Sequence, residues 1–209
     1  MPAIGLENVP EIIVSEPKPK VKIIMAGRLI YWKGFDIGIK AYLNVVDKYP
    51  NTELHILGEG KKKSNLQDLA GEYLNKNIFF KDIISHDEIF DFYRGYDIFM
   101  NTSLRDSGCM TMMEAVGVGL PCVAIATGGP KLLSNPDMQI NPANNKELIE
   151  NISKNLEILI DSIINNNKEV IDRYKGDREV LTMKKKIERI NSIYENILPN
   201  KGNKENEEC

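Results

Sequence analysis

The sequence predicts an α/β fold built around a doubly wound parallel sheet. From Val21 onward, short apolar runs alternate with longer segments in which apolar residues recur at helical spacing. This alternation is typical of parallel strands that are buried on both faces between crossover helices. Because such crossovers are right-handed, the helices are expected to cover both faces of one sheet.

Six short apolar segments are the predicted strands, and turn residues or helix-length segments separate them. They are Val21 to Ala26, Glu53 to Leu57, Asn77 to Phe80, Asp97 to Asn101, Pro121 to Ala126 and, shorter, Met138 to Ile140.

Helical periodicity fills the intervals. After the first strand, apolar residues recur at 37, 41, 42 and 45, and the run Ser85-His86-Asp87-Glu88 fits a capping box that opens a helix before Asp97. Two apolar stripes predict packing helices near the C-terminus. They run through Leu148, Ile152, Leu156, Leu159 and Ile163, and through Ile187, Ile190, Tyr194 and Ile197.

Composition narrows the classes of protein. The chain has 209 residues, 42% of them hydrophobic, and a net charge of -3, which excludes a disordered chain and gives no basic surplus for a nucleic-acid binder. The three cysteines are too few for a disulfide framework or a zinc site, which indicates a reducing, cytoplasmic setting. No apolar run approaches the roughly 18 residues of a membrane span, and the first residues lack the pattern of a signal peptide.

We expect three regions along the chain. Residues 1–20 carry four prolines and read as an interdomain linker arm, residues 21–199 as one domain with a helical C-terminal extension, and residues 200–209 as a disordered tail.

Candidate site residues follow the first and second predicted strands, because ligands of doubly wound sheets bind beyond the carboxyl ends of the strands. Gly27, Arg28 and Lys33 follow the first strand, and paired cations there suit a diphosphate. The alternative is a solvated loop with two surface charges. Gly58 and Gly60 follow the second strand and permit close approach to a ligand, although plain turn glycines are the preferred explanation for this segment taken alone. No complete dinucleotide fingerprint and no P-loop is present.

The segment after the fourth strand is the most informative. A loop feeds a helix start, which is a ready anion site, and its candidate ligands are Asp106, Ser107, Gly108, Cys109, Met110 and, two turns into the helix, Glu114. Two acceptor-only carboxylates around an anion site suit a diphosphate that carries hydroxyl groups at both ends, as a nucleotide sugar does. Alternatively, the aspartate only caps the helix and the glutamate is solvated. His55, inside a strand, and His86, next to a cap residue, lie outside this cluster, and we expect neither to act in catalysis.

Together these motifs resemble the donor-binding half of retaining GT-B glycosyltransferases of the group 1 or family 4 type. The resemblance covers about residues 21–160 and rests on Gly27-Arg28 with Lys33-Gly34, on Gly58-x-Gly60, on the loop from Asp106 to Glu114-Ala115, and on Gly119-Leu120-Pro121. It implies a Rossmann-like C-terminal domain that transfers a sugar from a nucleotide-diphosphate sugar to an acceptor hydroxyl, without a metal or other cofactor. No Asp-x-Asp pair is present that would hold a metal–diphosphate complex.

The resemblance also assigns roles. Arg28 and Lys33 match the pair that stabilises the departing diphosphate, Glu114 matches the glutamate that binds the donor ribose, and Asp106 stands where a glutamate near the transferred sugar is usual. Residues 107–110 form the loop whose backbone approaches sugar and phosphate, with Cys109 where glycine is common. Lys131 replaces a glutamate that many relatives have. The base pocket would lie near residues 81–84, and the sequence does not choose between UDP and GDP.

In such enzymes the acceptor binds to a preceding domain, which this sequence lacks. We therefore expect an excised donor domain that transfers little sugar alone, meets no nucleic acid, and contacts a membrane only through the absent domain. A non-catalytic nucleotide-binding module and a related nucleotide-sugar epimerase stay open as alternatives.

Overall fold

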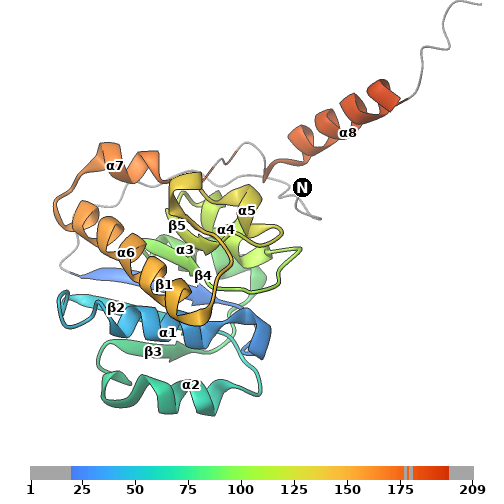
Figure 1. Ribbon diagram of the computed structural model, residues 1–209. Coiled ribbons are helices and arrows are strands. Elements are labelled where there is room, and N and C mark those ends of the chain that lie inside the picture. The colour runs from blue at the N-terminus through green and yellow to red at the C-terminus, as the bar shows by residue number, and fades with distance from the viewer. Residues whose placement is uncertain (1–19, 177, 179–180, 198–209) are drawn as a thin grey trace, which may run out of the picture.

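A single parallel sheet forms the centre of the protein. The computed structural model describes residues 20–176, 178 and 181–197, and in them six strands pair in the order β3-β2-β1-β4-β5-β6 (Figure 1). The strands are β1 (Val21–Ala26), β2 (Thr52–Leu57), β3 (Ile78–Lys81), β4 (Ile98–Asn101), β5 (Cys122–Ile125) and β6 (Gln139–Ile140), and all five pairings are parallel. The predicted fold class is confirmed, and each strand end lies within one residue of its predicted position.

Helices cover both faces of the sheet, as the crossover rule requires. One apolar core joins the sheet to α1 (Phe35–Leu43), α2 (Lys63–Ala70) and α6 (Asn145–Ile164). A second core joins the opposite face to α3 (Ile89–Arg94), α4 (Met110–Gly117) and α5 (Pro130–Leu133). Alternate residues of β1 serve the two cores, since Ile23 and Met25 belong to the first and Ile24 to the second.

The remaining elements are short or peripheral. In the described ranges, 3-10 turns interrupt the loops at η1 (Tyr31–Lys33), η2 (Gly71–Tyr73), η3 (His86–Glu88) and η4 (Pro136–Met138). Two further helices follow α6, namely α7 (Lys168–Arg173) and α8 (Met183–Ile197).

The long helix α6 shows how sequence pattern becomes packing. Its N-cap Asn144 accepts a hydrogen bond from the backbone N–H of Glu147 at 3.1 Å, which satisfies one of the free donors of the first turn. The predicted stripe is confirmed, and four of its five side chains are buried at the first core. Each fully buried Leu or Ile contributes about 1.5–3 kcal/mol relative to an exposed one.

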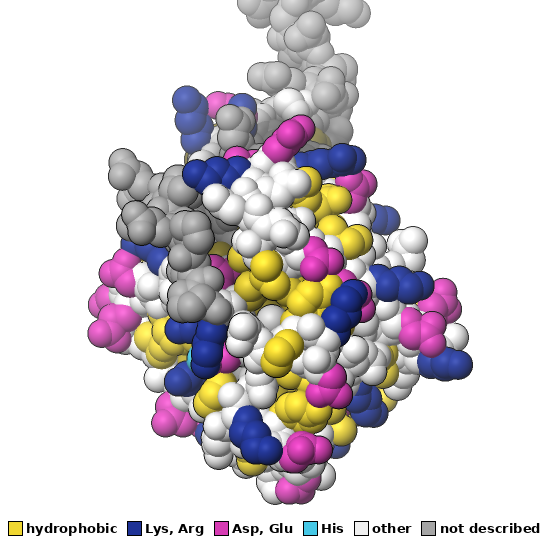
Figure 2. Space-filling view, turned by 90° about the vertical axis from the view of Figure 1, so that its left-hand side faces the viewer, with side chains coloured by type: hydrophobic (Ala, Val, Ile, Leu, Met, Phe, Trp, Pro, Cys, Tyr) yellow, Lys and Arg dark blue, Asp and Glu magenta, His cyan; other side chains and the backbone are white. Residues whose placement is uncertain are grey.

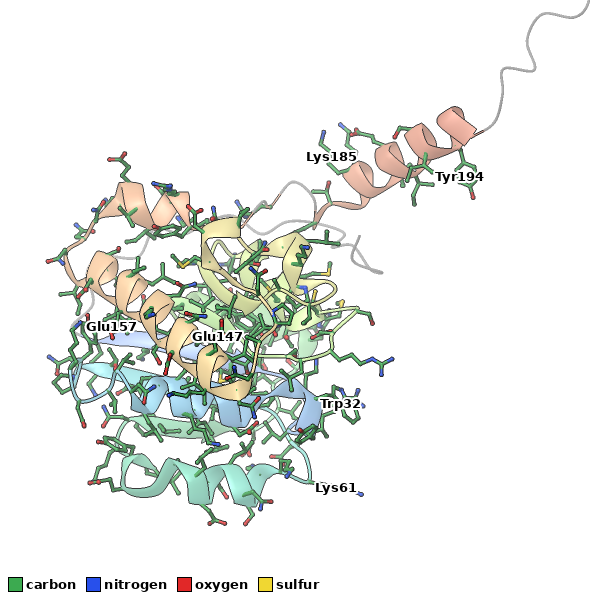
Figure 3. The ribbon with its side chains drawn as sticks, viewed as in Figure 1. Trp32, Lys61, Glu147, Glu157, Lys185 and Tyr194 are labelled. Atoms are coloured by element: carbon green, nitrogen blue, oxygen red, sulfur yellow. The ribbon has the colours of Figure 1, made fainter. Side chains whose placement is uncertain are left out.

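Helix α8 differs from this pattern. Its predicted apolar stripe forms a helix, but Ile187, Ile190, Ile193 and Tyr194 are exposed. The helix projects away from the sheet, and Tyr194 points into solvent (Figures 1 and 3). The expectation that this stripe is a packing face is therefore wrong for the part of the chain that the structure describes.

The capping box after β3 forms with altered geometry. The Ser85 hydroxyl donates to Glu88 Oε2 at 2.8 Å, and the serine makes no side-chain bond to the helix backbone. The first turn is consequently the 3-10 turn η3, and α3 begins only at Ile89.

The expected linker arm, apart from Lys20, and the expected tail lie outside the described residues. On the side of the molecule opposite Trp32 and Lys61, Lys and Arg side chains are interspersed with Asp and Glu (Figures 2 and 3). None of the helices in the described ranges combines the length and hydropathy needed to cross a lipid bilayer.

Candidate functional site

The candidate residues meet where β1 and β4 end side by side at the carboxyl edge of the sheet. This is the point at which the strand order reverses, because the chain leaves β3 at one side and returns at β4 next to β1. Doubly wound sheets bind ligands at this switch point.

Hydrogen bonds tie the loop after β1 to the loop after β4. The Thr102 hydroxyl donates to the carbonyl oxygen of Gly34 at 2.8 Å, and the backbone N–H of Leu104 donates to the carbonyl of Trp32 at 2.9 Å. The loop after β5 joins them, because the Thr127 hydroxyl donates to the carbonyl of Ser103 at 2.8 Å. Hydrogen bonds therefore hold the loops after β1, β4 and β5 together at this edge of the sheet.

An ion pair joins two of the predicted site residues, one from the loop after β1 and one from the loop after β4. Lys33 Nζ lies 2.6 Å from Asp106 Oδ2, and the two side chains are only 17% and 8% exposed. The other carboxylate oxygen, Oδ1, accepts a hydrogen bond from the backbone N–H of Cys109 at 2.9 Å. Asp106 thus pairs with the lysine and also stabilises the turn that enters α4. It has the contact expected of a capping residue, and it also lies beside another predicted site residue.

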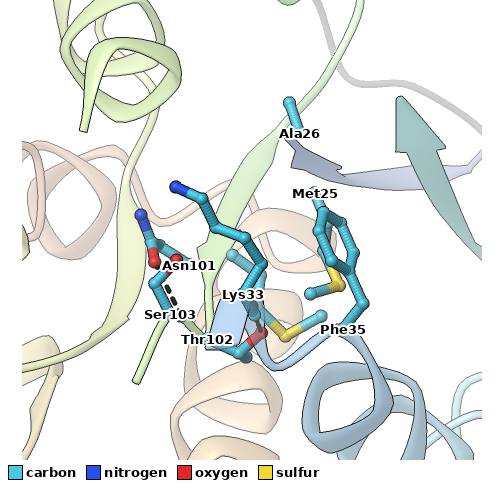
Figure 4. Close-up of a pocket in the computed structure, with 8 residues that line it drawn as sticks. Met25, Ala26, Lys33, Phe35, Asn101, Thr102 and Ser103 are labelled. Carbon is cyan, nitrogen blue, oxygen red and sulfur yellow. Dashed lines mark hydrogen bonds between the residues drawn. The ribbon is translucent and has the colours of Figure 1, made fainter. Parts of the chain in front are cut away.

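The two predicted cations do not share one environment. Arg28 is exposed and forms no ion pair with any described residue, whereas Lys33 is largely buried in its pair. Figure 4 shows the lysine side chain beside Asn101, Thr102 and Ser103 at the end of β4.

The paired glycines after β2 serve backbone packing. Gly58 has φ 143° and Gly60 has φ 158°, and a Cβ on them would lie 2.0 Å from the Gly27 carbonyl oxygen and 2.4 Å from that of Leu29. The close approach that these glycines allow is therefore to the neighbouring loop, as the turn-glycine alternative holds. Their predicted contact with a donor stays a prediction.

The entry to α4 is strained at its cap. Cys109 is the N-cap with φ 34° and ψ 44°, a left-handed conformation in which glycine is usual. Burial, together with the charge of Asp106, raises the pKa of its thiol to about 12, so the sulfur is a packing group rather than a nucleophile. Ser107 is exposed, while Gly108 and Met110 are partly buried around the same turn.

Glu114 is buried, which contradicts the solvated alternative, and it lies one turn into α4 rather than two, because the helix begins at Met110. Burial raises the pKa of its carboxyl, and His86 and the Tyr93 hydroxyl oppose that rise. His86 Nδ1 lies 3.8 Å from Glu114 Oε1. This histidine is exposed, and its expected separation from the motif cluster is wrong.

The other candidates lie apart. His55 is buried in β2, where its ring contacts Glu53 and Tyr96, as expected for a residue without a catalytic role. Lys131, in α5, is exposed. In the segment expected to form the base pocket, Ile83 is 72% exposed.

Two hollows mark the surface near this edge. A cavity of about 10 Å³, lined by Lys33, Phe35 and the end of β4 among others, has room for about one water molecule. A pocket of about 310 Å³ lies between β6 and the start of α6 and includes none of the predicted site residues.

The strand order, the switch point and the flanking helices define a Rossmann-like α/β domain. The chain belongs to the family described as glycosyl transferases group 1, whose family model matches residues 10–177. Its fold is that of the C-terminal domain of GT-B glycosyltransferases.

Relatives and solved structures are consistent with this. The chain is 28% identical over 140 residues to protein CapJ of Staphylococcus aureus, covering 66% of this chain and 36% of CapJ. It is 29% identical over 136 residues to one component of the human phosphatidylinositol N-acetylglucosaminyltransferase, covering 64% of this chain and 28% of that component. The chain thus spans about a third of the length of these curated relatives.

Among solved structures, the C-terminal domain of the group 1 family protein LpcC from Francisella tularensis matches with a TM-score of 0.61 at 22% identity. That match covers 74% of this chain and 80% of that domain. The pneumococcal O-GlcNAc transferase GtfA, solved with UDP and GlcNAc, matches with a TM-score of 0.63 at 17% identity. It covers 94% of this chain and 39% of GtfA.

Sequence reasoning missed three features of this site. The ion pair of Lys33 with Asp106 joins residues 73 positions apart, which no local pattern reveals. The hydroxyl groups of Thr102 and Thr127 brace the loops, and Tyr93 approaches Glu114 from the interior. The only available signal was that hydroxyl residues cluster after strands.

Proposed function

We propose that this chain is the donor-binding part of a retaining glycosyltransferase, which moves a hexose-type sugar from a nucleotide-diphosphate sugar to an acceptor hydroxyl. The observation that carries the proposal is the placement of one cation, Lys33, between two loops that also present Asp106 and Glu114 at one end of the sheet. The cation would bind the diphosphate of such a donor, and the two carboxylates would accept hydrogen bonds from the hydroxyl groups on either side of it.

In the proposed mechanism, leaving-group stabilisation is the main contribution. Arg28 and Lys33 bind the diphosphate oxygens, and the start of α4 adds the positive end of a helix dipole. Charge develops on the diphosphate as the bond to the sugar breaks, and these preorganised groups stabilise that charge without a metal ion. Lysine reaches the phosphate by exchanging its partner, because in the structure it is paired with Asp106.

The two carboxylates take the two ends of the donor. Asp106, once its lysine is engaged by phosphate, accepts hydrogen bonds from hydroxyl groups of the transferred sugar. Glu114 accepts the hydroxyl groups of the ribose. Residues 107–110, with Gly27, Gly58 and Gly60, shape the backbone around the phosphates.

The names of similar proteins support a donor of this class. GtfA was solved with UDP and GlcNAc, and the human relative is named as part of an N-acetylglucosaminyltransferase. We extend to this chain only the nucleotide-diphosphate sugar, and UDP and GDP are both candidates.

We further propose that transfer needs an acceptor domain that precedes this one in the intact enzyme. Half of the cleft that positions the acceptor and excludes water is outside this domain, and loss of such positioning removes a large share of a rate enhancement. The exposed face of α8, through Ile187, Ile190 and Tyr194, is the surface we assign to that contact. The setting we propose is cytoplasmic, with membrane contact only through the other domain.

Calorimetric titration tests the proposal. The folded chain is titrated with UDP, GDP, ADP and their sugar conjugates, and the titration is repeated with Arg28→Ala and Glu114→Ala. Lys61→Ala, which removes an exposed cation at the same sheet edge, serves as the matched control. We expect saturable binding of one nucleotide, weakened about tenfold or more by each of the first two changes and not by the control. A folded chain that binds none of these nucleotides would contradict the proposal.

A further inference from the structure

The carboxyl group of Glu114 is held between two ionisable side chains from different elements. From outside, the imidazole of His86 on η3 approaches Oε1 to 3.8 Å, and the histidine side chain is 73% exposed while the glutamate side chain is 7% exposed. From inside lies the buried Tyr93 of α3, whose phenol pKa is raised by burial and, after that, by the charge of Glu114. The hydroxyl of this tyrosine has no hydrogen-bond partner among the described residues.

No other ionisable group of the neighbouring elements is positioned in the same way. Helix α4 carries no further charged side chain. On β5, Cys122 acts on Tyr93, and burial raises the pKa of its own thiol so that it stays protonated. On α5, Lys131 is exposed. On α3, Arg94 pairs with Asp91. Within the described residues, the positive charge that acts on the Glu114 carboxyl is that of His86.

Burial and the histidine act on Glu114 in opposite directions. Burial favours the neutral carboxyl, so this group takes up a proton at a higher pH than an ordinary glutamate does. A neutral carboxyl has lost acceptor capacity for ribose hydroxyls. Histidine is the side chain whose charge changes in the physiological pH range, so a histidine beside this carboxyl can oppose its protonation there.

We propose that His86 is a positioning residue of the nucleoside subsite, which keeps Glu114 ionised and aimed at the ribose as the pH falls. This inference rests on the proposed function, because it assigns Glu114 to the ribose. At 3.8 Å the contact is electrostatic rather than a direct hydrogen bond, so a charge at this position matters more than the shape of the ring.

Three substitutions separate charge from shape. His86→Ala removes both, His86→Gln keeps a polar side chain without charge, and His86→Lys keeps a charge without the ring. Affinity for the nucleoside diphosphate that the wild-type chain binds is measured at pH 6 and pH 8.5. In parallel, the Glu114 carboxyl is titrated by carbon NMR in the protein without nucleotide, with Glu114→Gln identifying the signal.

At pH 6 we expect the Ala and Gln variants to bind about two- to fivefold more weakly than the wild type, as for an exposed charge pair, and the Lys variant to restore binding. At pH 8.5 we expect the Ala variant and the wild type to agree. The Glu114 carboxyl should titrate at higher pH in the Ala and Gln variants, and not in Lys61→Ala.

An equal loss at both pH values would overturn the proposal, since it would mean that His86 contacts the ligand or supports the loop directly. An unchanged Glu114 titration in His86→Ala would also overturn it. If the wild-type chain binds no nucleotide, the proposed function fails, and the Glu114 titration still decides whether the histidine controls the ionisation of that carboxyl.

Discussion

Replacing Asp106 by asparagine is expected to strengthen the binding of a nucleoside diphosphate rather than weaken it. In the proposed complex, Lys33 would reach the phosphate only by leaving its 2.6 Å ion pair, and the carboxylate would also repel the incoming anion. Asparagine keeps an oxygen to accept the Cys109 backbone N–H, so the turn into α4 is retained.

The size of the effect follows from the burial of the pair. Exposed ion pairs contribute up to about 1 kcal/mol, whereas breaking a fully buried one costs about 3–5 kcal/mol. With side chains 17% and 8% exposed, this pair lies between those limits, and part of its loss is repaid by the new contact with phosphate. We expect a net gain of about 1 kcal/mol, which is about a fivefold tighter dissociation constant.

The assay is calorimetric titration of the wild type, Asp106→Asn and Lys33→Met with the nucleoside diphosphate. A second titration uses the corresponding nucleotide sugar. The lysine variant should bind both ligands about tenfold more weakly or worse, because it lacks the phosphate cation. The asparagine variant should gain affinity for the diphosphate and gain less, or lose, with the sugar conjugate. Urea unfolding of each variant confirms that the fold is retained.

Weaker binding of the diphosphate by a well-folded Asp106→Asn protein would refute this reasoning. It would mean that the carboxylate is itself required for the diphosphate complex, and not a partner that the lysine leaves.

Three further predictions concern stability and reactivity. Gly58→Ala should lower the free energy of unfolding in urea by about 2 kcal/mol or more, because its Cβ would lie 2.0 Å from the Gly27 carbonyl oxygen at φ 143°; a loss below about 0.5 kcal/mol would contradict this. In a Cys209→Ser background, the Cys109 thiol should resist a thiol reagent at pH 8 until the chain unfolds, since burial raises its pKa to about 12; prompt labelling of the native protein would count against it. Burial lowers the pKa of His55 against the opposing effect of Glu53, so the unfolded state binds more protons and stability should fall as the pH drops below about 6.5. His55→Gln should flatten that part of the stability curve measured by urea unfolding, and an unchanged slope would argue against the assignment.

The strands and their order along the chain could be predicted because buried parallel strands are continuous apolar runs. Val21–Ala26 has the predicted limits, and β2 gains only Thr52, whose hydroxyl bonds to the Tyr49 carbonyl at 2.8 Å. The packing of the C-terminal helices could not be predicted in the same way. The stripe on α8 has the same spacing as that on α6, and spacing alone does not say whether a partner covers the helix.

The candidate site was predictable as a set of residues and not as a set of contacts. Arg28 and Lys33 follow the same strand and read as equivalent cations, yet one is exposed and the other is paired. The difference arises because Asp106 approaches from a strand that becomes adjacent only through the sheet topology. The burial of Glu114 and its contact with His86 have the same origin, since α3 and α4 pack together through long-range contacts.

The reversal of strand order also bears on how the domain folds and opens. The β1–β3 half and the β4–β6 half are joined by the pairing of β1 with β4, where Asp97 also accepts a hydrogen bond from the Lys22 backbone at 2.8 Å, and by the packing of α1 on α6. The hydrogen bonds from Thr102 and Leu104 and the ion pair of Lys33 with Asp106 all span this junction. These contacts form only after segments far apart in the sequence have met, and contacts of that kind slow folding. A ligand that binds to loops of both halves would therefore hold the two halves together. Its presence should slow amide hydrogen exchange along β1 and β4, including at residues that the ligand does not contact.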